Sequence, residues 1–139
     1  AYWDSEVKLS QVGGYSDYPV FTRKVATDVS YLACAARLFE HSDVIRPAFA
    51  THNAYTIAAI KELAAGYSAS SSGSEAGRNG LPVGQRRLFE FQRLHGMGEE
   101  VYDALHALEG NRKTPVRIYA PVGGHKELLA YLVRRLLEN

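Results

Sequence analysis

The feature that most constrains this chain is a regular alternation of short apolar segments with segments of helical periodicity. Each apolar segment is followed by turn residues and then by a helical pattern, in the pairs 48–51 with 55–65, 88–95 with 99–108, and 116–120 with a helix that begins at Lys126. Strands and helices that alternate in this way pair through right-handed crossovers into a parallel sheet. The sequence therefore predicts an α/β chain with one parallel sheet.

The remaining segments are shorter or irregular. Residues 5–12 are expected to form a short helix that ends at Gly13, and residues 18–24 to form an extended segment. The stretch 66–86 is rich in serine and glycine and cannot pack into a core, so we expect a mobile surface loop there.

A longer helix is expected between Thr27 and Phe39, with Thr27 or Asp28 as its N-terminal cap. Its apolar face is predicted to consist of Val29, Leu32, Ala33, Ala36 and Phe39. Cys34, the one cysteine of the chain, lies in an apolar run and is expected to be a buried thiol without a disulfide, which favours a reducing, cytosolic setting.

In the next helix, Asn53 is placed to cap the N-terminus. The predicted buried face of this helix consists of Ile57, Ile60, Leu63 and Ala64.

The alternation fits either a (βα)8 barrel or a doubly wound sheet. Two features favour the barrel: polar side chains (Glu90, Gln92, Arg117 and Tyr119) line one face of the later strands, and no Gly-rich phosphate loop joins a strand to a helix. Three units amount to about half of an eight-unit barrel. Because the chain does not open on Met and a helical pattern is still running at its last residues, we expect a piece of a longer protein.

Charge and hydropathy argue against two classes of partner. Sixteen Lys and Arg residues against fifteen Asp and Glu residues give a net charge of +1 without a long basic block, so nucleic acid is not expected to bind this segment. No apolar stretch approaches the ~18 residues of a membrane-spanning helix.

Polar residues occur where each expected strand ends. Thr51, His52 and Asn53 follow the first strand, Arg93 to His95 end the second, and Tyr119 ends the third. The carboxyl ends of parallel strands point into the ligand site of such folds. Any one of these residues could instead serve as a turn or cap residue, but their coincidence at successive strand ends favours a site.

Two other functions stay open on the residues alone. His52, His95 and His125 would suit a metal-dependent barrel hydrolase, although none of them has a second histidine or carboxylate at ligand spacing. A non-catalytic binding module is the third possibility, because the chain is expected to be incomplete.

The last helix has two distinct faces. One face carries Tyr131, Arg134, Arg135 and Glu138, and the opposite face carries Leu129, Leu132, Val133, Leu136 and Leu137. The polar face can be an ordinary solvated surface with an Arg134–Glu138 ion pair, which is the simpler interpretation of the residues. Alternatively, two adjacent guanidinium groups beside a tyrosine suit bidentate binding of a carboxylate.

Six blocks of the sequence resemble the proline dehydrogenase domain of the bifunctional proline utilization A family, in the family's order. They are AYWDSEVK, FTRKVATDVSYLACA, FATHNAYTIAAI, FEFQRLHGMGE, RIYAPVG and LLAYLVRRLLEN. They cover nearly the whole chain outside the Ser/Gly-rich stretch. The resemblance implies that residues 1–139 form the second half of a distorted (βα)8 barrel, with FAD at the carboxyl ends of the strands and the final helix over the flavin.

The resemblance also implies roles for individual residues. Arg134 and Arg135 would hold the proline carboxylate, and the proline ring would be enclosed by Tyr119, Tyr131 and Leu94, with Ala1 nearby. The implied FAD contacts are Tyr2, Trp3, Thr22, Lys24, Thr51, His52, Asn53, Gln92, Arg135 and Glu138. Within this set, Thr22, Lys24 and Glu138 match positions at the adenosine end of the cofactor.

The activity implied is removal of a hydride from C5 of L-proline to FAD, giving pyrroline-5-carboxylate, with a membrane quinone as electron acceptor. No residue of this segment is expected to transfer a proton in catalysis. The rest of the same polypeptide would supply the first half of the barrel and an aldehyde dehydrogenase domain. The expected location is the bacterial cytoplasm, peripheral to the inner membrane.

Overall fold

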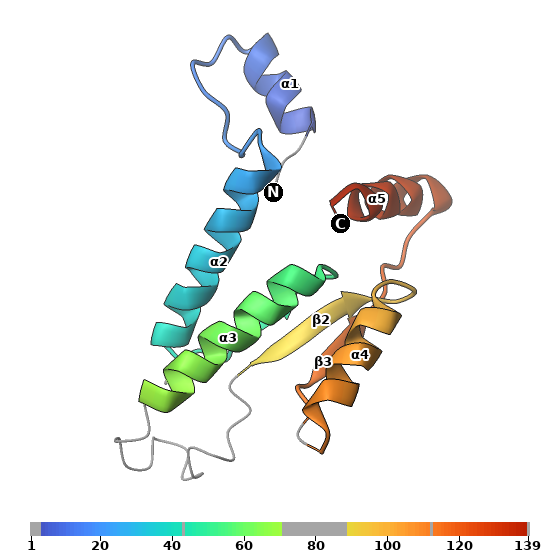
Figure 1. Ribbon diagram of the computed structural model, residues 1–139. Coiled ribbons are helices and arrows are strands. Elements are labelled where there is room, and N and C mark those ends of the chain that lie inside the picture. Colours follow the sequence, from blue (N-terminus) through green and yellow to red (C-terminus); the bar gives the residue numbers. More distant parts are fainter. Residues whose placement is uncertain (1–3, 43, 71–88, 112, 139) are drawn as a thin grey trace.

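The computed structural model describes residues 4–42, 44–70, 89–111 and 113–138 (Figure 1). Within them the chain forms, in order, α1 (Asp4–Val12), α2 (Lys24–Glu40), β1 (Ala48–Ala50), α3 (Ala54–Ser70), β2 (Glu90–Leu94), α4 (Glu99–Glu109), β3 (Val116–Tyr119) and α5 (His125–Glu138). The three predicted strand–helix pairs are confirmed, as is the short helix that ends before Gly13. Among these residues, no helix is both long and apolar enough to cross a membrane.

The three strands form one parallel sheet in the order β1-β2-β3. In register, Phe49 lies beside Phe91 and Phe91 beside Val116, while Ala50 lies beside Gln92 and Gln92 beside Arg117. Because side chains alternate between the faces of a strand, these two rows lie on opposite faces of the sheet. One face is therefore apolar and the other polar, as the sequence predicts.

The apolar face packs against helices through a cluster of aromatic rings. Phe89 lies 5.4 Å from Phe39, 5.8 Å from Phe49 and 5.3 Å from Phe91, measured between ring centroids. Tyr102 of α4 continues the cluster at 5.8 Å from Phe91. Edge-to-face and tilted rings at these separations stabilise a core beyond the area that they bury. This core ties α2, α3 and α4 to the sheet.

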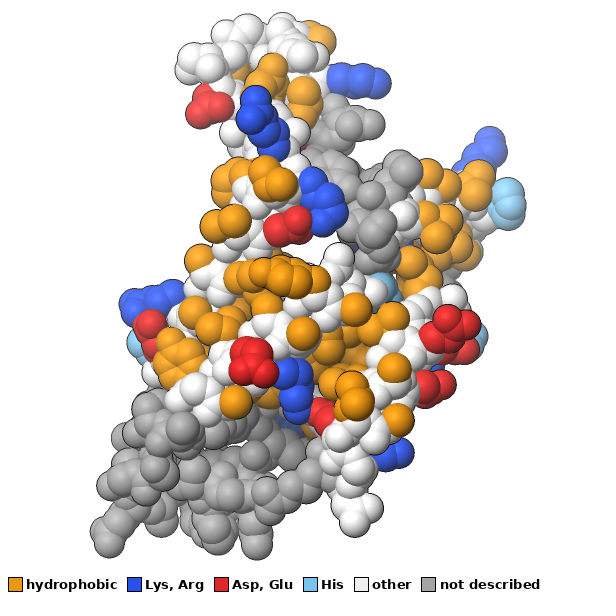
Figure 2. Space-filling model, viewed as in Figure 1, with side chains coloured by type: hydrophobic (Ala, Val, Ile, Leu, Met, Phe, Trp, Pro, Cys, Tyr) orange, Lys and Arg blue, Asp and Glu red, His pale blue; other side chains and the backbone are white. Residues whose placement is uncertain are grey.

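The helices take different positions relative to the sheet. α3 and α4 lie along the sheet, whereas α5 lies beyond the arrowhead ends of the strands (Figure 1). In the space-filling view, hydrophobic side chains gather along α3 and between α3 and α4, with charged side chains scattered around them (Figure 2).

The predicted start of α2 and the predicted segment before it were wrong. The helix begins at Lys24 with Arg23 as its cap residue, so Thr27 and Asp28 lie inside its first turns. Within the expected extended segment 18–24, residues 19, 20, 22 and 23 form bends and Lys24 is already helical. The early start of the helix at Lys24 is stabilised by an ion pair between Lys24 and Asp28, one helical turn apart.

The buried face of α2 is only partly the predicted one: Phe39 is buried and Leu32 packs against the core as expected, but the rest of the face differs. Ala35 and Phe39 are buried, with Tyr31 packed against the same core, whereas Val29 is 70% exposed. Spacing of four residues from Tyr31 to Ala35 to Phe39 directs this stripe to the core. It leaves Cys34 exposed, contrary to the prediction of a buried thiol.

The predicted buried face of α3 is confirmed, and the helix is longer than predicted. Its buried residues Ile57, Ile60 and Ala64 are those expected, with Leu63 partly buried beside them. The helix continues to Ser70, so residues 66–70 of the predicted loop are helical. The rest of that predicted loop, residues 71–86, lies outside the described residues.

Candidate ligand-binding site

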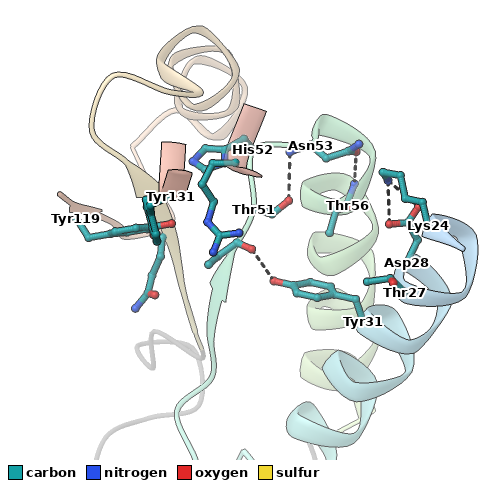
Figure 3. Close-up of a pocket in the computed structure, with 13 residues that line it drawn as sticks. Lys24, Thr27, Asp28, Tyr31, Thr51, His52, Asn53, Thr56, Tyr119 and Tyr131 are labelled. Atoms are coloured by element: carbon teal, nitrogen blue, oxygen red, sulfur yellow. Dashed lines mark hydrogen bonds and ion pairs between the residues drawn. The ribbon is translucent and has the colours of Figure 1, made fainter. Parts of the chain in front are cut away.

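A cavity of about 460 Å³ opens at the carboxyl ends of the strands, between α2, α3 and α5 (Figure 3). It is lined by Lys24, Thr27, Asp28, Tyr31, Ala50, Thr51, His52, Asn53, Thr56, Gln92, Tyr119, Tyr131 and Arg135. This volume lies within the usual range of small-molecule sites. Polar groups from six different elements and loops therefore converge on one space.

The end of β1 is fixed by two tyrosine hydroxyl groups. Tyr31 of α2 donates a hydrogen bond to the carbonyl oxygen of Ala50 at 3.0 Å, and Tyr102 of α4 donates to that of Thr51 at 2.8 Å. Burial raises the pKa of Tyr31 to about 12 and also raises the pKa of Tyr102. Both hydroxyl groups thus stay protonated, and they hold the carbonyls where the strand enters the cavity.

The three residues after β1 each take part in a hydrogen bond. Asn53 accepts from the backbone N–H of Thr56 at 3.1 Å through its Oδ1, which confirms it as the cap of α3. Its own N–H donates to the Oγ1 of Thr51 at 3.2 Å. His52 accepts from the backbone N–H of Leu94 at 2.9 Å through its Nε2, which links β1 to β2.

The wall formed by α2 combines a cation with an unsatisfied hydroxyl group. The Nζ of Lys24 lies 2.8 Å from the Oδ2 of Asp28. One turn further along the cavity, the Oγ1 of Thr27 is buried and has no hydrogen-bond partner within the described part of the chain. A buried hydroxyl group without a partner is costly, so a ligand acceptor or donor there would relieve it.

The amide of Gln92 is oriented by Glu90, which forms an ion pair with Arg117 on the polar face of the sheet. Its Nε2 donates to the Oε1 of Glu90 at 3.4 Å, and Glu90 receives two hydrogen bonds from Arg117, at 2.6 and 3.0 Å. The Arg117 guanidinium holds the pKa of Glu90 below its ordinary value. A charged Glu90 therefore draws the amide N–H of Gln92 toward itself.

The helix α5 closes the cavity on the side of β3. The guanidinium of Arg135 lies 4.8 Å from the ring centroid of Tyr131, in cation–π contact. Tyr119, at the end of β3, lies close to Tyr131 in the close-up view (Figure 3). The polar face predicted for the last helix thus faces the cavity at these two positions.

The structure brings eight of the sequence-predicted site residues together around this cavity. They are Lys24, Thr51, His52, Asn53, Gln92, Tyr119, Tyr131 and Arg135. Leu94 is fully buried beside Tyr119 on the same face of the sheet but does not line the cavity. Thr22 is exposed outside it. Ala1, Tyr2, Trp3 and the side chains of Arg134 and Glu138 lie outside what the structure describes.

The histidines of the hydrolase interpretation are not grouped. His52 lines the cavity, whereas His95 and His125 are exposed and do not. Across the described ranges, no three His, Cys, Asp or Glu side chains are placed to hold a metal ion.

Sequence reasoning missed four polar side chains of the cavity wall. Thr27, Asp28 and Tyr31 of α2 were assigned to caps or left unassigned, and Thr56 of α3 was passed over. Lys24 and Asp28, and likewise Thr27 and Tyr31, are four residues apart. This polar stripe along one side of a helix was the signal that could have located the wall.

Comparison with known proteins identifies the family. The family model described as proline dehydrogenase matches residues 1–139, the whole chain. The chain belongs to the proline dehydrogenase family. That family is generally flavin-dependent.

The relatives are bifunctional bacterial proteins. The chain is 55% identical over 141 residues to the bifunctional protein PutA of Escherichia coli K12 and 49% identical over 144 residues to that of Rhizobium meliloti. Both matches cover 100% of this chain and 10% of the relative. The chain therefore spans about a tenth of the length of the curated relatives it matches.

Solved structures show where the segment lies in the fold. A crystal structure of a proline utilization A variant from Bradyrhizobium japonicum matches with a TM-score of 0.72 at 48% identity, over 99% of this chain and 12% of that one. The Bdellovibrio bacteriovorus protein inactivated by N-propargylglycine matches with a TM-score of 0.74 at 37% identity, over 100% and 12%. The three-stranded sheet matches part of the proline dehydrogenase (βα)8 barrel, so the barrel prediction is confirmed over the doubly wound one.

Proposed function

We propose that this chain is the second half of a FAD-dependent proline dehydrogenase barrel, in a protein that oxidises L-proline to pyrroline-5-carboxylate. The observation that carries the proposal is the convergence of eight expected ligand contacts on one cavity, in a chain that matches the proline dehydrogenase family from end to end.

The chemistry of the cavity suits the phosphate-bearing part of FAD. The N-terminus of α3 opens on it at Asn53, and helix N-termini favour anions through their unsatisfied N–H groups. Lys24 adds a cation, and Thr27 offers a buried hydroxyl group that lacks a partner among the described residues. In this proposal Thr51, His52 and Asn53 contact the phosphates and the adjoining chain of the cofactor. Thr22, Lys24 and Glu138 lie toward its adenosine end.

The polar face of the sheet suits the flavin ring. Gln92 donates one amide N–H to Glu90, so its carbonyl oxygen and its second N–H can contact a ligand. We assign Gln92, Tyr2 and Trp3 to the flavin, with Arg135 contacting its side chain. When bound, FAD supplies the acceptor for the hydride that leaves C5 of proline.

The residues of α5 and β3 then bind and orient the substrate. In the proposal, Arg134 and Arg135 hold the proline carboxylate, since paired guanidinium groups suit bidentate contacts. The contact between Arg135 and the Tyr131 ring limits the guanidinium to few orientations before proline arrives. Orientation of this kind is the chain's main catalytic contribution, because no side chain here need transfer a proton.

The proline ring would be enclosed on its apolar sides. Tyr119 and Tyr131 line the cavity beside Arg135. Leu94 is buried next to Tyr119 and supports it from the same face of the sheet. Ala1 would complete this enclosure. An apolar surround excludes water and strengthens the charged contacts to the carboxylate.

The whole protein would contain more than this segment. By resemblance to the bifunctional family, the rest of the same polypeptide supplies the other half of the barrel and an aldehyde dehydrogenase domain. A membrane quinone would reoxidise the flavin, with the protein in the bacterial cytoplasm and peripheral to the inner membrane.

The test is made on the full-length protein that contains this chain. Purified protein is examined for flavin by its absorbance spectrum and for metal by elemental analysis. Anaerobic addition of L-proline should then bleach the flavin band, and pyrroline-5-carboxylate should form in step with reduction of a quinone. Stoichiometric zinc in a colourless protein would instead support a metal-dependent hydrolase and reject the proposal.

A further inference from the structure

The turn that follows β2 contributes a hydrogen bond to the end of β3. The backbone N–H of His95, the first residue of the turn, donates to the carbonyl oxygen of Tyr119 at 2.8 Å. This bond lies just beyond the final register pair of the two strands, Leu94 with Tyr119. Tyr119 lines the cavity, so the place of one cavity residue depends on the shape of the turn.

The turn is closed by its own backbone and is also held by a side chain. The N–H of Met97 donates to the carbonyl oxygen of Leu94 at 3.0 Å, with Gly96 between them at a φ of +79°, where side chains are strained. The carbonyl oxygen of Met97 accepts from the Nη1 of Arg93 at 3.3 Å. The same nitrogen donates to the Oε1 of Glu99, in the first turn of α4, at 3.1 Å. Arg93 thus joins the strand, the turn and the helix.

Arg93 is a cation on the apolar face of the sheet. Side chains alternate along β2, so it shares the face of Phe91, which belongs to the aromatic core. Its side chain is 12% exposed, whereas that of Glu99 is 57% exposed. An apolar side chain at such a position often stabilises a fold as well as an ion pair does. What the guanidinium adds here is a fixed geometry for the turn.

We propose that Arg93 is a positioning residue for the proline pocket. With Glu99 it clamps the turn after β2, and the turn holds the end of β3 where Tyr119 meets the substrate. This inference rests on the proposed function and adds to it a residue on the helix-covered face of the sheet. Arg93 does not line the cavity, so it acts through the amide of His95 and the carbonyl of Tyr119.

The test compares two cations that each pair with a glutamate of α4, at opposite ends of that helix. Arg93 pairs with Glu99, and Lys61 pairs with Glu109. Arg93→Met leaves its exposed glutamate in water, so the melting temperature should stay close to that of the parent. Lys61→Met leaves Glu109, whose side chain is only 9% exposed, without its cation, so this variant should melt lower.

Steady-state kinetics of the full-length protein should give the opposite order. We expect the KM for L-proline to rise about five- to tenfold in Arg93→Met, with the Kd for FAD unchanged, and to stay parental in Lys61→Met. Arg93→Lys should recover part of the loss, because an ammonium can still donate to Met97 and Glu99. Hydrogen exchange of the apoprotein, measured on peptides that cover residues 94–98, should be faster in Arg93→Met than in Lys61→Met.

The outcomes distinguish this inference from the function on which it rests. A parental KM in Arg93→Met, or an equal rise in Lys61→Met, would overturn the positioning role and leave the flavoenzyme intact. If Arg93→Met does not fold, Glu99→Ala decides at an exposed position: its KM should rise about two- to threefold, and a parental KM would overturn the inference. A full-length parent that does not oxidise proline would reject the proposed function and this inference with it.

Discussion

Asn53 combines two roles that substitution can separate. Its Oδ1 caps α3 by accepting from the N–H of Thr56 at 3.1 Å, and the residue also lines the cavity. Asn53→Ala removes the cap, and loss of an asparagine cap costs about 1 kcal/mol. For a domain of 150 to 250 residues this corresponds to a fall in Tm of about 2–4 °C. Asn53→Asp keeps the cap, because aspartate is an equally good cap residue and favours the positive end of the helix.

The two variants should have the opposite order in FAD affinity. Asn53→Asp brings a negative charge to a cavity that is proposed to hold a diphosphate. Two like charges about 6 Å apart repel by about 3 kcal/mol at an effective dielectric constant near 20. Salt and Lys24 reduce this repulsion, so we expect a loss of at least about 1.4 kcal/mol, or tenfold in Kd. Asn53→Ala should lose only about two- to threefold.

The assay measures the Tm of the apoproteins and titrates each with FAD at low and high salt. Asn111→Asp is the matched control, because it adds the same charge at an exposed position outside the cavity. The weakening caused by Asn53→Asp should shrink as salt rises. Parental FAD affinity for Asn53→Asp at low salt would refute a phosphate at the N-terminus of α3, and a low Tm for the same variant would refute the capping argument.

Two further predictions concern groups around the cavity. Tyr31→Phe removes the hydroxyl group that holds the carbonyl at the end of β1 and should lower the free energy of unfolding, measured by chemical denaturation, by about 1 kcal/mol. Tyr55→Phe, at an exposed position of α3, should leave it unchanged. Equal losses in the two variants would contradict the role of that hydrogen bond. Burial alone would raise the pKa of Glu109, but hydrogen bonds from Lys61 and Thr114 lower it below its ordinary value of 4.5. A lowered folded-state pKa stabilises the fold above that ordinary value, and this stabilisation is lost as the pH falls through the folded-state pKa. Urea unfolding from about pH 6 to about pH 3 should therefore show a shallower loss of stability for Glu109→Gln than for the parent, and parallel curves would contradict it.

The sequence alone predicted the elements whose signal is local. Strand and helix periodicity located β1, β2 and β3 with the helices that follow them, and the polar residues at the strand ends were visible as Thr51, His52 and Asn53. The polar stripe of α5 was visible too, because Tyr131 and Arg135 are one turn apart. The residues alone did not decide whether this stripe is a solvated surface or a cavity wall, because both use the same residue types. The resemblance to the proline dehydrogenase domain was needed to choose between them.

The predicted buried face of α2 was wrong in part because its neighbours decide which side is buried. Val29 and Tyr31 are both hydrophobic enough for a core, and only the position of the sheet directs Tyr31 inward. The exposed Cys34 follows from the same rotation. Periodicity also could not predict ion pairs between distant segments, such as that of Glu90 with Arg117. Strand register determines which of these side chains become neighbours.

The central claim is that α5 belongs to the proline site of a flavoenzyme. It is tested most directly by steady-state kinetics and flavin content of Arg135→Met in the full-length protein, with Arg134→Met as a companion. Arg37→Met is the matched control, since this arginine is exposed on α2 and pairs with Glu40 outside the cavity.

A charged hydrogen bond contributes ~1.5 to 3 kcal/mol, so the KM for proline should rise roughly ten- to a hundredfold in both α5 variants. Arg135→Met should in addition bind FAD more weakly, and Arg37→Met should match the parent in both respects. Parental KM and flavin content in Arg134→Met and Arg135→Met alike would show that α5 is only a solvated helix and would contradict the account.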